Sequence, residues 1–384
     1  MIAEVIYHLG PENPVGALCS ILLALLCVNA LGKETLLSGN QTRVKTIDGL
    51  RGYLAFLVFL HHCVVWHGYL KSGQWKTPES ILYANFGSSS VALFFMITGF
   101  LFYTKLIKNK NRQMDWFRLY WGRACRLVPV YLFVIIILGM IVVVETDFKA
   151  RAPWMELVKG YLKWLLFTIQ GAPDLNGLKN TFIIVAGVTW TLPHEWKFYG
   201  ILPLLSLTQG VRPPWILLGL SFLVLLVWHP HGAVLESFIA GLITAILVDK
   251  KWLVLLAGTR IGTWLTVLCL LLGYAVFPDS SQEVSIFFLG LAFCMIASGN
   301  TLFGLMEWST SRLLGEMTYS IYLLHGVVLF LVFGFVNRVS GGNELGLTWF
   351  WVIVLLTIPI LLGASYLSYK YLEQPGMRAA NLIR

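Results

Sequence analysis

The sequence predicts an all-α fold, a polytopic membrane bundle of helices. Of its 384 residues, 57% are hydrophobic and only 12% are charged, and the mean hydropathy is +0.74. Soluble domains carry about 25% charged residues. Several apolar runs approach the roughly 20 residues that an α-helix needs to cross the hydrocarbon core of a bilayer. Composition and run length together place the chain among integral membrane proteins.

Hydropathy predicts about ten core transmembrane helices and one extra helix before them. The extra helix and a cytoplasmic linker form residues 1–44, and the core domain forms residues 45–384. A further apolar segment, Tyr161–Ile169, is too short to cross and should lie in the interface or re-enter. The predicted spans are Pro14–Leu31, Leu50–Trp66, Tyr83–Thr104, Leu127–Val144, Trp190–Leu207, Trp215–Trp228, Ala233–Val248, Ile261–Phe277, Val284–Met306, Tyr319–Val336 and Leu347–Tyr369.

The extra N-terminal helix lacks the positive segment with which a secretory signal begins. Residues 1–13 carry Glu4 and Glu12 but no Lys or Arg. We therefore expect a retained helix with its N-terminus outside, although the run is short enough for cleavage to be the alternative. The six cysteines lie in or beside apolar runs without paired spacing. They are expected to be packing residues, with no disulfide framework and no metal site.

The distribution of Lys and Arg supports this set of spans and gives it an orientation. With residues 33–51 in the cytoplasm, the cytoplasmic segments hold 19 Lys and Arg, and the opposite side holds eight. Five of those eight lie in the long loop 145–189, where the charge bias is least informative. The C-terminus is then cytoplasmic. The net charge of +9 fits loops that face anionic membrane lipids, so no nucleic-acid partner is expected.

The first core span carries ionisable groups at depths where they are costly to bury. An α-helix turns about 100° and rises about 1.5 Å per residue, so Arg51 and His62 lie within about 20° of one face and about 16 Å apart. Asp48 lies about 40° from that face, and His61 is turned about 80° away. Such groups inside a membrane are by default functional. The alternative is that Arg51 only snorkels to the interface and His62 only bonds a neighbouring helix.

Two later stretches also carry candidate site residues. Arg123 and Arg126 are spaced i, i+3, so they share a helix face just below the membrane. Two guanidiniums suit a phosphate-bearing ligand, and anchoring to lipid head groups is the other interpretation. Glu195 lies near the outer end of its span, where it can pair with Lys197, orient a catalytic histidine or bond a sugar hydroxyl. Residues i and i+2 of a helix do not face each other, which disfavours the local pair.

These stretches, in order, resemble the acyltransferase family 3 of integral membrane O-acyltransferases over most of residues 46–378. The matching motifs are IDGLRG with Arg51 and, eleven positions later, His62; the FF-x-x-x-GF run Phe94–Phe100; Arg123 and Arg126 before Pro129; Trp190-Thr191-Leu192 with Glu195 and Phe198-Tyr199; Tyr319–Leu323 with His325; and Glu373-x-Pro375. The resemblance implies that His62 is essential for transfer and that Arg51, Arg123 and Arg126 are important for activity. Two departures from the family pattern are His61, where an apolar residue is usual, and the extra first helix.

The resemblance implies transfer of an acyl group, usually acetyl, to a hydroxyl of an envelope carbohydrate, a polysaccharide, lipopolysaccharide or lipid-linked glycan. The donor would be cytoplasmic acetyl-CoA, and the location a bacterial inner membrane. The residues agree with this, because Arg51, Arg123 and Arg126 would hold the donor's phosphates. His62 would act as general base, and Glu195 would orient the acceptor or the histidine. A covalent acyl-histidine intermediate is a variant that the sequence leaves open.

A membrane transporter of a lipid or oligosaccharide is the alternative from another class of protein. In that case His62 and Glu195 would relay protons or bind substrate. The feature that favours the acyltransferase is the cytoplasmic arginine cluster below a mid-membrane histidine, which a transporter does not require.

Cysteine labelling of intact cells tests the predicted orientation. An impermeant thiol reagent should label a cysteine placed at Gly73 or Gly342, because both positions are predicted to face outside. It should not label one placed at Asn109 until the cells are broken. The unsubstituted protein gives the background from the native cysteines, and labelling of the Asn109 variant in intact cells would overturn the orientation.

Overall fold

The structure, a computed structural model, describes residues 10–31, 44–230, 232–278, 282–342 and 345–382. Within these ranges it contains helices and no strand, which confirms the all-α prediction. Some residues used in the sequence analysis lie outside the described ranges. They are Glu4 and three of the 19 Lys and Arg predicted to be cytoplasmic, namely Lys33, Arg43 and Arg384.

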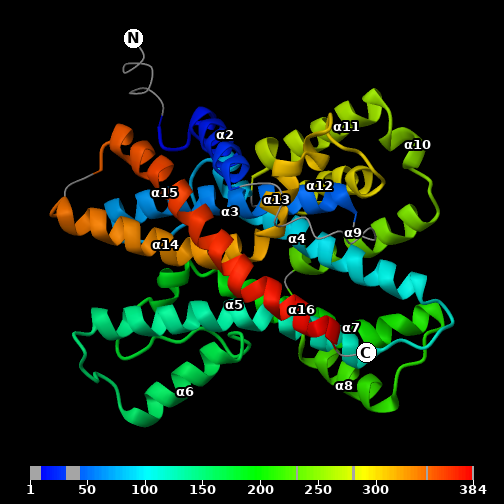
Figure 1. Cartoon of the computed structure of the whole chain (residues 1–384), viewed down its shortest axis with the longest axis horizontal. Helices are drawn as coiled ribbons and strands as arrows, with labels where there is room; N and C mark the ends of the chain where they lie inside the picture. The colour runs from blue at the N-terminus through cyan, green and yellow to red at the C-terminus, as the bar shows by residue number, and fades with distance from the viewer. Residues whose placement is uncertain (1–9, 32–43, 231, 279–281, 343–344, 383–384) are drawn as a thin grey trace.

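The helices follow one another along the chain, and most connections between them are short. Their bounds are α2 (Pro14–Ala30), α3 (Lys45–Ser72), α4 (Ile81–Lys108), α5 (Trp116–Glu145), α6 (Trp154–Leu165), α7 (Thr191–Ser206), α8 (Trp215–Val227), α9 (Gly232–Asp249), α10 (Val254–Ala257), α11 (Arg260–Leu271), α12 (Gln282–Ala297), α13 (Ser309–Glu316), α14 (Thr318–Val339), α15 (Leu347–Ser368) and α16 (Gln374–Leu382). A π-turn, Tyr369–Glu373, joins α15 to α16. Figure 1 shows α3 and α14 running alongside each other, with α15 crossing in front of them and α16 continuing onto α5.

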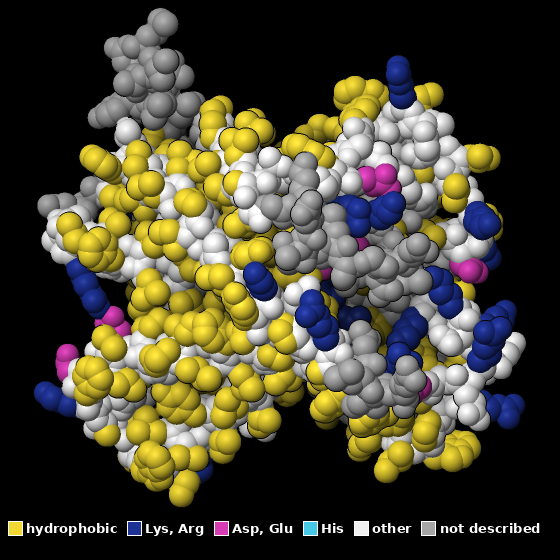
Figure 2. All heavy atoms as spheres, viewed as in Figure 1, with side chains coloured by type: hydrophobic (Ala, Val, Ile, Leu, Met, Phe, Trp, Pro, Cys, Tyr) yellow, Lys and Arg dark blue, Asp and Glu magenta, His cyan; other side chains and the backbone are white. Residues whose placement is uncertain are grey.

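Among the described residues, six helices are long and apolar enough to cross a membrane, namely α3, α4, α5, α9, α14 and the α15–α16 stretch. Four shorter apolar helices, α2, α8, α11 with its π-helical extension, and α12, accompany them. These helices identify a multi-pass membrane protein. Every predicted span overlaps a helix, although the span Val284–Met306 runs past the end of α12 at Ala297. Because α7 belongs to neither group, the count of ten core spans stays a prediction. Figure 2 shows hydrophobic side chains over much of one face, with Lys and Arg gathered near the C-terminal end.

The short helix α6 has the character of an interfacial helix. It covers the first half of the segment Tyr161–Ile169 that was predicted to lie in the interface or re-enter. Large apolar side chains such as Trp154 and Leu162 are exposed on it, although Trp164 is fully buried. A helix with one apolar exposed side is typical of a membrane surface.

The helix α3 lies at the centre of the bundle. Most of its side chains are buried, as expected for a helix that is apolar on almost all sides. Its polar side chains bond to four other helices or their ends. The contacts are Thr46 Oγ1 to Ile296 O (2.8 Å), Tyr53 OH to Ser311 Oγ (2.7 Å), His61 Nδ1 to Tyr83 O (2.8 Å) and His62 Nδ1 to His325 Nε2 (3.2 Å).

Glycines let the backbone of α3 touch its neighbours. A Cβ at Gly49 would overlap the carbonyl of Met306, and a Cβ at Gly315 on α13 would overlap the carbonyl of Asp48. Small residues at such crossings allow membrane helices to pack closely. The first turns of α3, which carry Arg51, are therefore held in a fixed place against α13.

The extra helix α2 is docked onto the same bundle. Its Gly16 faces the ring of Trp351 on α15, where a Cβ would overlap the indole. The hydroxyl of Tyr83 on α4 donates to the carbonyl of Asn13, directly before α2 (2.9 Å). The helix is therefore attached to the core at both α15 and α4.

Candidate active site

A pocket lined by three arginines lies between α3, α4, α5, α7 and α14. We name it the basic pocket, and its polar lining residues are Arg51, Thr98, Arg123, Arg126, Thr191, Glu195, Thr318, Tyr319 and Tyr322. Arg51 comes from the second turn of α3, and the other two arginines come from successive turns of α5. The structure thus brings together the three arginines that the sequence analysis selected. The remaining wall is apolar, with Phe94, Phe95, Leu101 and Leu127 among its residues.

The three arginines have different surroundings. Arg126 Nε donates to Glu373 Oε1 at 3.2 Å, and Glu373 is fully buried. The guanidinium of Arg123 lies over the ring of Phe102, 4.6 Å from its centroid, in a cation–π contact. Arg51 Nε is buried and has no hydrogen-bond partner in the described part of the chain. A buried donor without a partner is costly, so Arg51 is the arginine whose geometry most clearly calls for a ligand.

Glu195 belongs to the basic pocket. It lies in the second turn of α7, and its carboxylate accepts a hydrogen bond from the hydroxyl of Tyr199, one turn further along. The backbone carbonyl of Tyr199 in turn accepts from Tyr120 on α5 (3.1 Å). Among the contacts of the described residues, this is the one that Glu195 makes, and it leads neither to Lys197 nor to His62. The structure therefore places Glu195 beside the arginines.

A second pocket contains the two histidines of α3. We name it the histidine pocket, and it is lined by His61, His62, Thr77, Ser88, Ala186 and Trp190 among others. His62 is 9% exposed. Its Nδ1 lies 3.0 Å from the carbonyl of Val58, one turn back on α3, and the ring also interacts with the backbone of Ala186. Within the described ranges, no group of three or more His, Cys, Asp or Glu is placed to hold a metal ion.

His61 also lines the histidine pocket. Its ring packs edge-on against that of His62, with centroids 4.8 Å apart, and its Nδ1 lies 2.8 Å from the carbonyl of Tyr83. Gly87 makes room for it, because a Cβ there would meet the His61 ring at 2.9 Å. The helical-face argument separates the two histidines by about 100°. The close approach of α4 nevertheless brings both rings to the same pocket.

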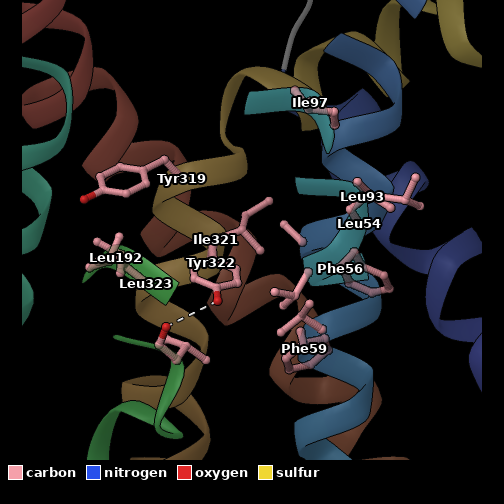
Figure 3. Close-up of a cluster of buried hydrophobic side chains, with 14 of the residues drawn as sticks. Leu54, Phe56, Phe59, Leu93, Ile97, Leu192, Tyr319, Ile321, Tyr322 and Leu323 are labelled. Carbon is pink, nitrogen blue, oxygen red and sulfur yellow. Dashed lines mark hydrogen bonds between the residues drawn. The ribbon is translucent and has the colours of Figure 1, made fainter. Parts of the chain in front are cut away.

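The two pockets meet at a thin partition. Val91 of α4 and Tyr322 of α14 line both of them. The hydroxyl of Tyr322 bonds to Thr191 Oγ1 (3.1 Å) and donates to the carbonyl of Val188 (3.3 Å). Figure 3 shows Tyr322 on α14 with its hydroxyl directed at the chain that enters α7. Tyr322 and Val91 therefore belong to the wall of both the basic pocket and the histidine pocket.

Two residues at the site were noted in the sequence only as parts of motifs. His325 of α14 is completely buried, and its Nε2 lies 3.2 Å from His62 Nδ1. Glu373, which pairs with Arg126, also accepts from Ser320 Oγ at 3.3 Å. The signal available in the sequence was an ionisable residue inside one apolar span, His325, and another just after the last span, Glu373. Without the tertiary structure, nothing paired those spans with α3 or α5.

Comparison with known families agrees with these motifs. A family model described as an acyltransferase domain matches residues 44–369, most of the chain. The chain belongs to acyltransferase family 3. The resemblance drawn from the motifs is thereby confirmed, and α2 lies before the matched residues. No curated protein and no solved structure gives a match to the chain.

We expect the ion pair of Arg126 to be structural as well as part of the pocket. Arg126→Met leaves the buried Glu373 without its partner, which should destabilise the protein by about 3 kcal/mol. Adding Glu373→Gln removes the unpaired charge and should recover much of the loss. The measurement is the apparent melting temperature of purified protein in detergent.

The exposed pair between Arg338 and Glu145 provides the matched control, with side chains 66% and 27% exposed. Arg338→Met should change the melting temperature little, because exposed ion pairs contribute little stability. Equal effects of Arg338→Met and Arg126→Met would contradict the structural role.

Proposed function

We propose that this acyltransferase moves an acyl group, most simply acetyl, from acyl-CoA to a hydroxyl of an envelope carbohydrate. The observation that carries the proposal is the pair of neighbouring pockets that share Tyr322 and Val91 as wall residues. One pocket offers cations for an anionic donor, and the other offers an imidazole for an acceptor. A reaction between two substrates of unlike chemistry needs such an arrangement.

The basic pocket suits the donor. Coenzyme A carries phosphates at one end and a thioester at the other. Arg51 and Arg123 provide guanidinium groups that bind phosphate through planar, bidentate donors. Arg126 adds charge but is partly neutralised by Glu373. The apolar inner wall near Phe94 would receive the pantetheine arm and the acyl group.

The histidine pocket suits a carbohydrate hydroxyl. Trp190 at its edge is 49% exposed and presents an aromatic face on which a sugar ring can lie. Thr77 and Ser88 add hydroxyl groups to the lining. A pocket with a mostly apolar wall and a few polar groups is typical of a small-molecule site. An acceptor hydroxyl at His62 would replace the interaction of its ring with the Ala186 backbone.

The chemistry follows from these positions. His62 takes the proton of the acceptor hydroxyl as the oxygen attacks the thioester carbonyl. The carbon–sulfur bond breaks, and the coenzyme A thiolate leaves and takes the proton from His62. An ester and a free thiol result, so atoms and charges balance. General-base catalysis of this kind contributes about 10²- to 10⁴-fold. Glu195, beside the arginines and bonded to Tyr199, would orient the donor end of this reaction.

We expect Arg123→Ala to weaken donor binding more than it slows the chemical step. Loss of a charge-assisted contact costs about 1.5–3 kcal/mol, or roughly ten- to a hundred-fold in affinity. The measurement is the KM and kcat for acetyl-CoA, with release of the thiol as the signal. Arg118→Ala, on the exposed side of the same helix, is the control. An unchanged KM for Arg123→Ala would favour lipid anchoring over phosphate binding.

A comparison of the two neighbouring histidines tests the proposed function itself. His62→Ala should abolish transfer of acetyl from acetyl-CoA to the cell-envelope glycan fraction, because it removes the base. His61→Phe should keep substantial activity, because His61 contacts the carbonyl of Tyr83 and forms part of the wall. Both variants are compared at matched membrane abundance. A fully active His62→Ala variant would refute the general base and make the transporter the better explanation.

A further inference from the structure

We infer that His325 is a positioning residue that fixes the proton and the orientation of His62. The inference rests on the proposed function, in which His62 is the base. His325 lies on α14, and its Nε2 is 3.2 Å from Nδ1 of His62 on α3. The two rings are 263 positions apart in the chain, with centroids 5.1 Å apart and planes at 39°. His325 is completely buried.

The backbone carbonyls next to the two rings determine which nitrogen carries the proton. His325 Nδ1 lies 3.2 Å from the carbonyl of Ile321, and His62 Nδ1 lies 3.0 Å from the carbonyl of Val58. A carbonyl oxygen only accepts hydrogen bonds, so each Nδ1 must carry hydrogen. A neutral imidazole has one N–H, which leaves His325 Nε2 as an acceptor. His62 Nδ1–H is therefore shared between the Val58 carbonyl and His325 Nε2.

The opposite arrangement is unfavourable at both histidines. If His325 donated from Nε2, its Nδ1 lone pair would face the carbonyl oxygen of Ile321. The Nδ1 lone pair of His62 would likewise face the oxygen of Val58. Two acceptors would then oppose each other at two buried places, where unsatisfied polar groups are costly. The carbonyls of Val58 and Ile321 thus favour the form of His62 whose basic nitrogen is Nε2, and in this form the Ala186 backbone beside the ring is the contact that an acceptor hydroxyl would replace.

This form is the one that the reaction requires. The nitrogen that takes the proton of the acceptor hydroxyl must present a lone pair, and Nε2 does so when Nδ1 carries the hydrogen. After proton transfer, His62 is an imidazolium, and its Nδ1–H bond to His325 becomes charge-assisted. Such bonds are roughly twice as strong as neutral ones. His325 therefore stabilises the charge that develops during the chemical step and has little effect on donor binding.

Burial alone does not explain a histidine at this position. The Ile321 carbonyl lies within a regular helix and does not depend on a side chain for a partner. An apolar residue would fill the space without the cost of burying an imidazole. The buried ring is accounted for by what it bonds to on α3.

The test uses purified full-length protein, acetyl-CoA and the cell-envelope glycan fraction. His325→Leu removes the acceptor, His325→Gln places an amide oxygen near the former Nε2, and the shorter His325→Asn reaches only the former Nδ1. We expect kcat to fall roughly ten- to a hundred-fold in His325→Leu, the effect of losing a charge-assisted bond, with the KM for acetyl-CoA unchanged. His325→Gln should retain clearly more activity than His325→Asn.

His67→Leu is the matched control, because His67 is also a buried histidine of α3 but packs on Phe350 away from the pocket. It should retain nearly full kcat. If His325→Leu fails to fold, the activities of His325→Gln and His325→Asn still test the inference. Equal activity of these two variants overturns it. A wild-type kcat in His325→Leu, or a change confined to KM, also overturns it. A fully active His325→Leu beside an inactive His62→Ala refutes only this inference, whereas an active His62→Ala refutes the proposed function.

Discussion

The hydrocarbon interior offers no hydrogen bonds, and this constraint shapes the whole bundle around α3. Every polar side chain on that helix must find a partner on another helix or remain unsatisfied at a cost. Thr46, Tyr53, His61 and His62 do so with four different neighbours, which are α12, α13, α4 and α14 in that order. The same bonds that satisfy α3 therefore determine which helices surround it. The backbone contacts at Gly49 and Gly315 then fix its depth against α13.

Two pockets of opposite character result from this arrangement. Arg51 near the start of α3 faces the basic pocket, and His62 further along faces the histidine pocket. Tyr322 closes the gap between them and is held by Thr191 and Val188. In the proposed reaction the acyl group crosses at this point, which explains how substrates from opposite sides of a membrane can react without an open channel.

The arginines of the basic pocket differ in whether their side chains already have a partner in the protein. Arg126 is committed to the buried Glu373, whereas Arg51 retains a buried nitrogen without a partner. Arg126 thus joins α5 to the π-turn before α16, and in the proposed function Arg51 binds the donor. The extra helix α2 is linked through Tyr83 to the wall of the histidine pocket. Asn13 accepts from Tyr83, whose own carbonyl contacts His61 in the pocket wall.

The sequence by itself determined the class of protein, the helices, the family and the three arginines, because run length, helical spacing and ordered motifs are local properties. Arg51 and His62 could be related to each other because a single helix fixes their geometry. The partners His325 and Glu373 lie about 250 or more positions from the groups they contact. Only the tertiary structure brings them together, because packing of α3 on α14 and of α5 on the C-terminal segment depends on the fit of whole helix faces. For the same reason, only the tertiary structure shows that Glu195 lies beside the arginines and that His61 lines the histidine pocket.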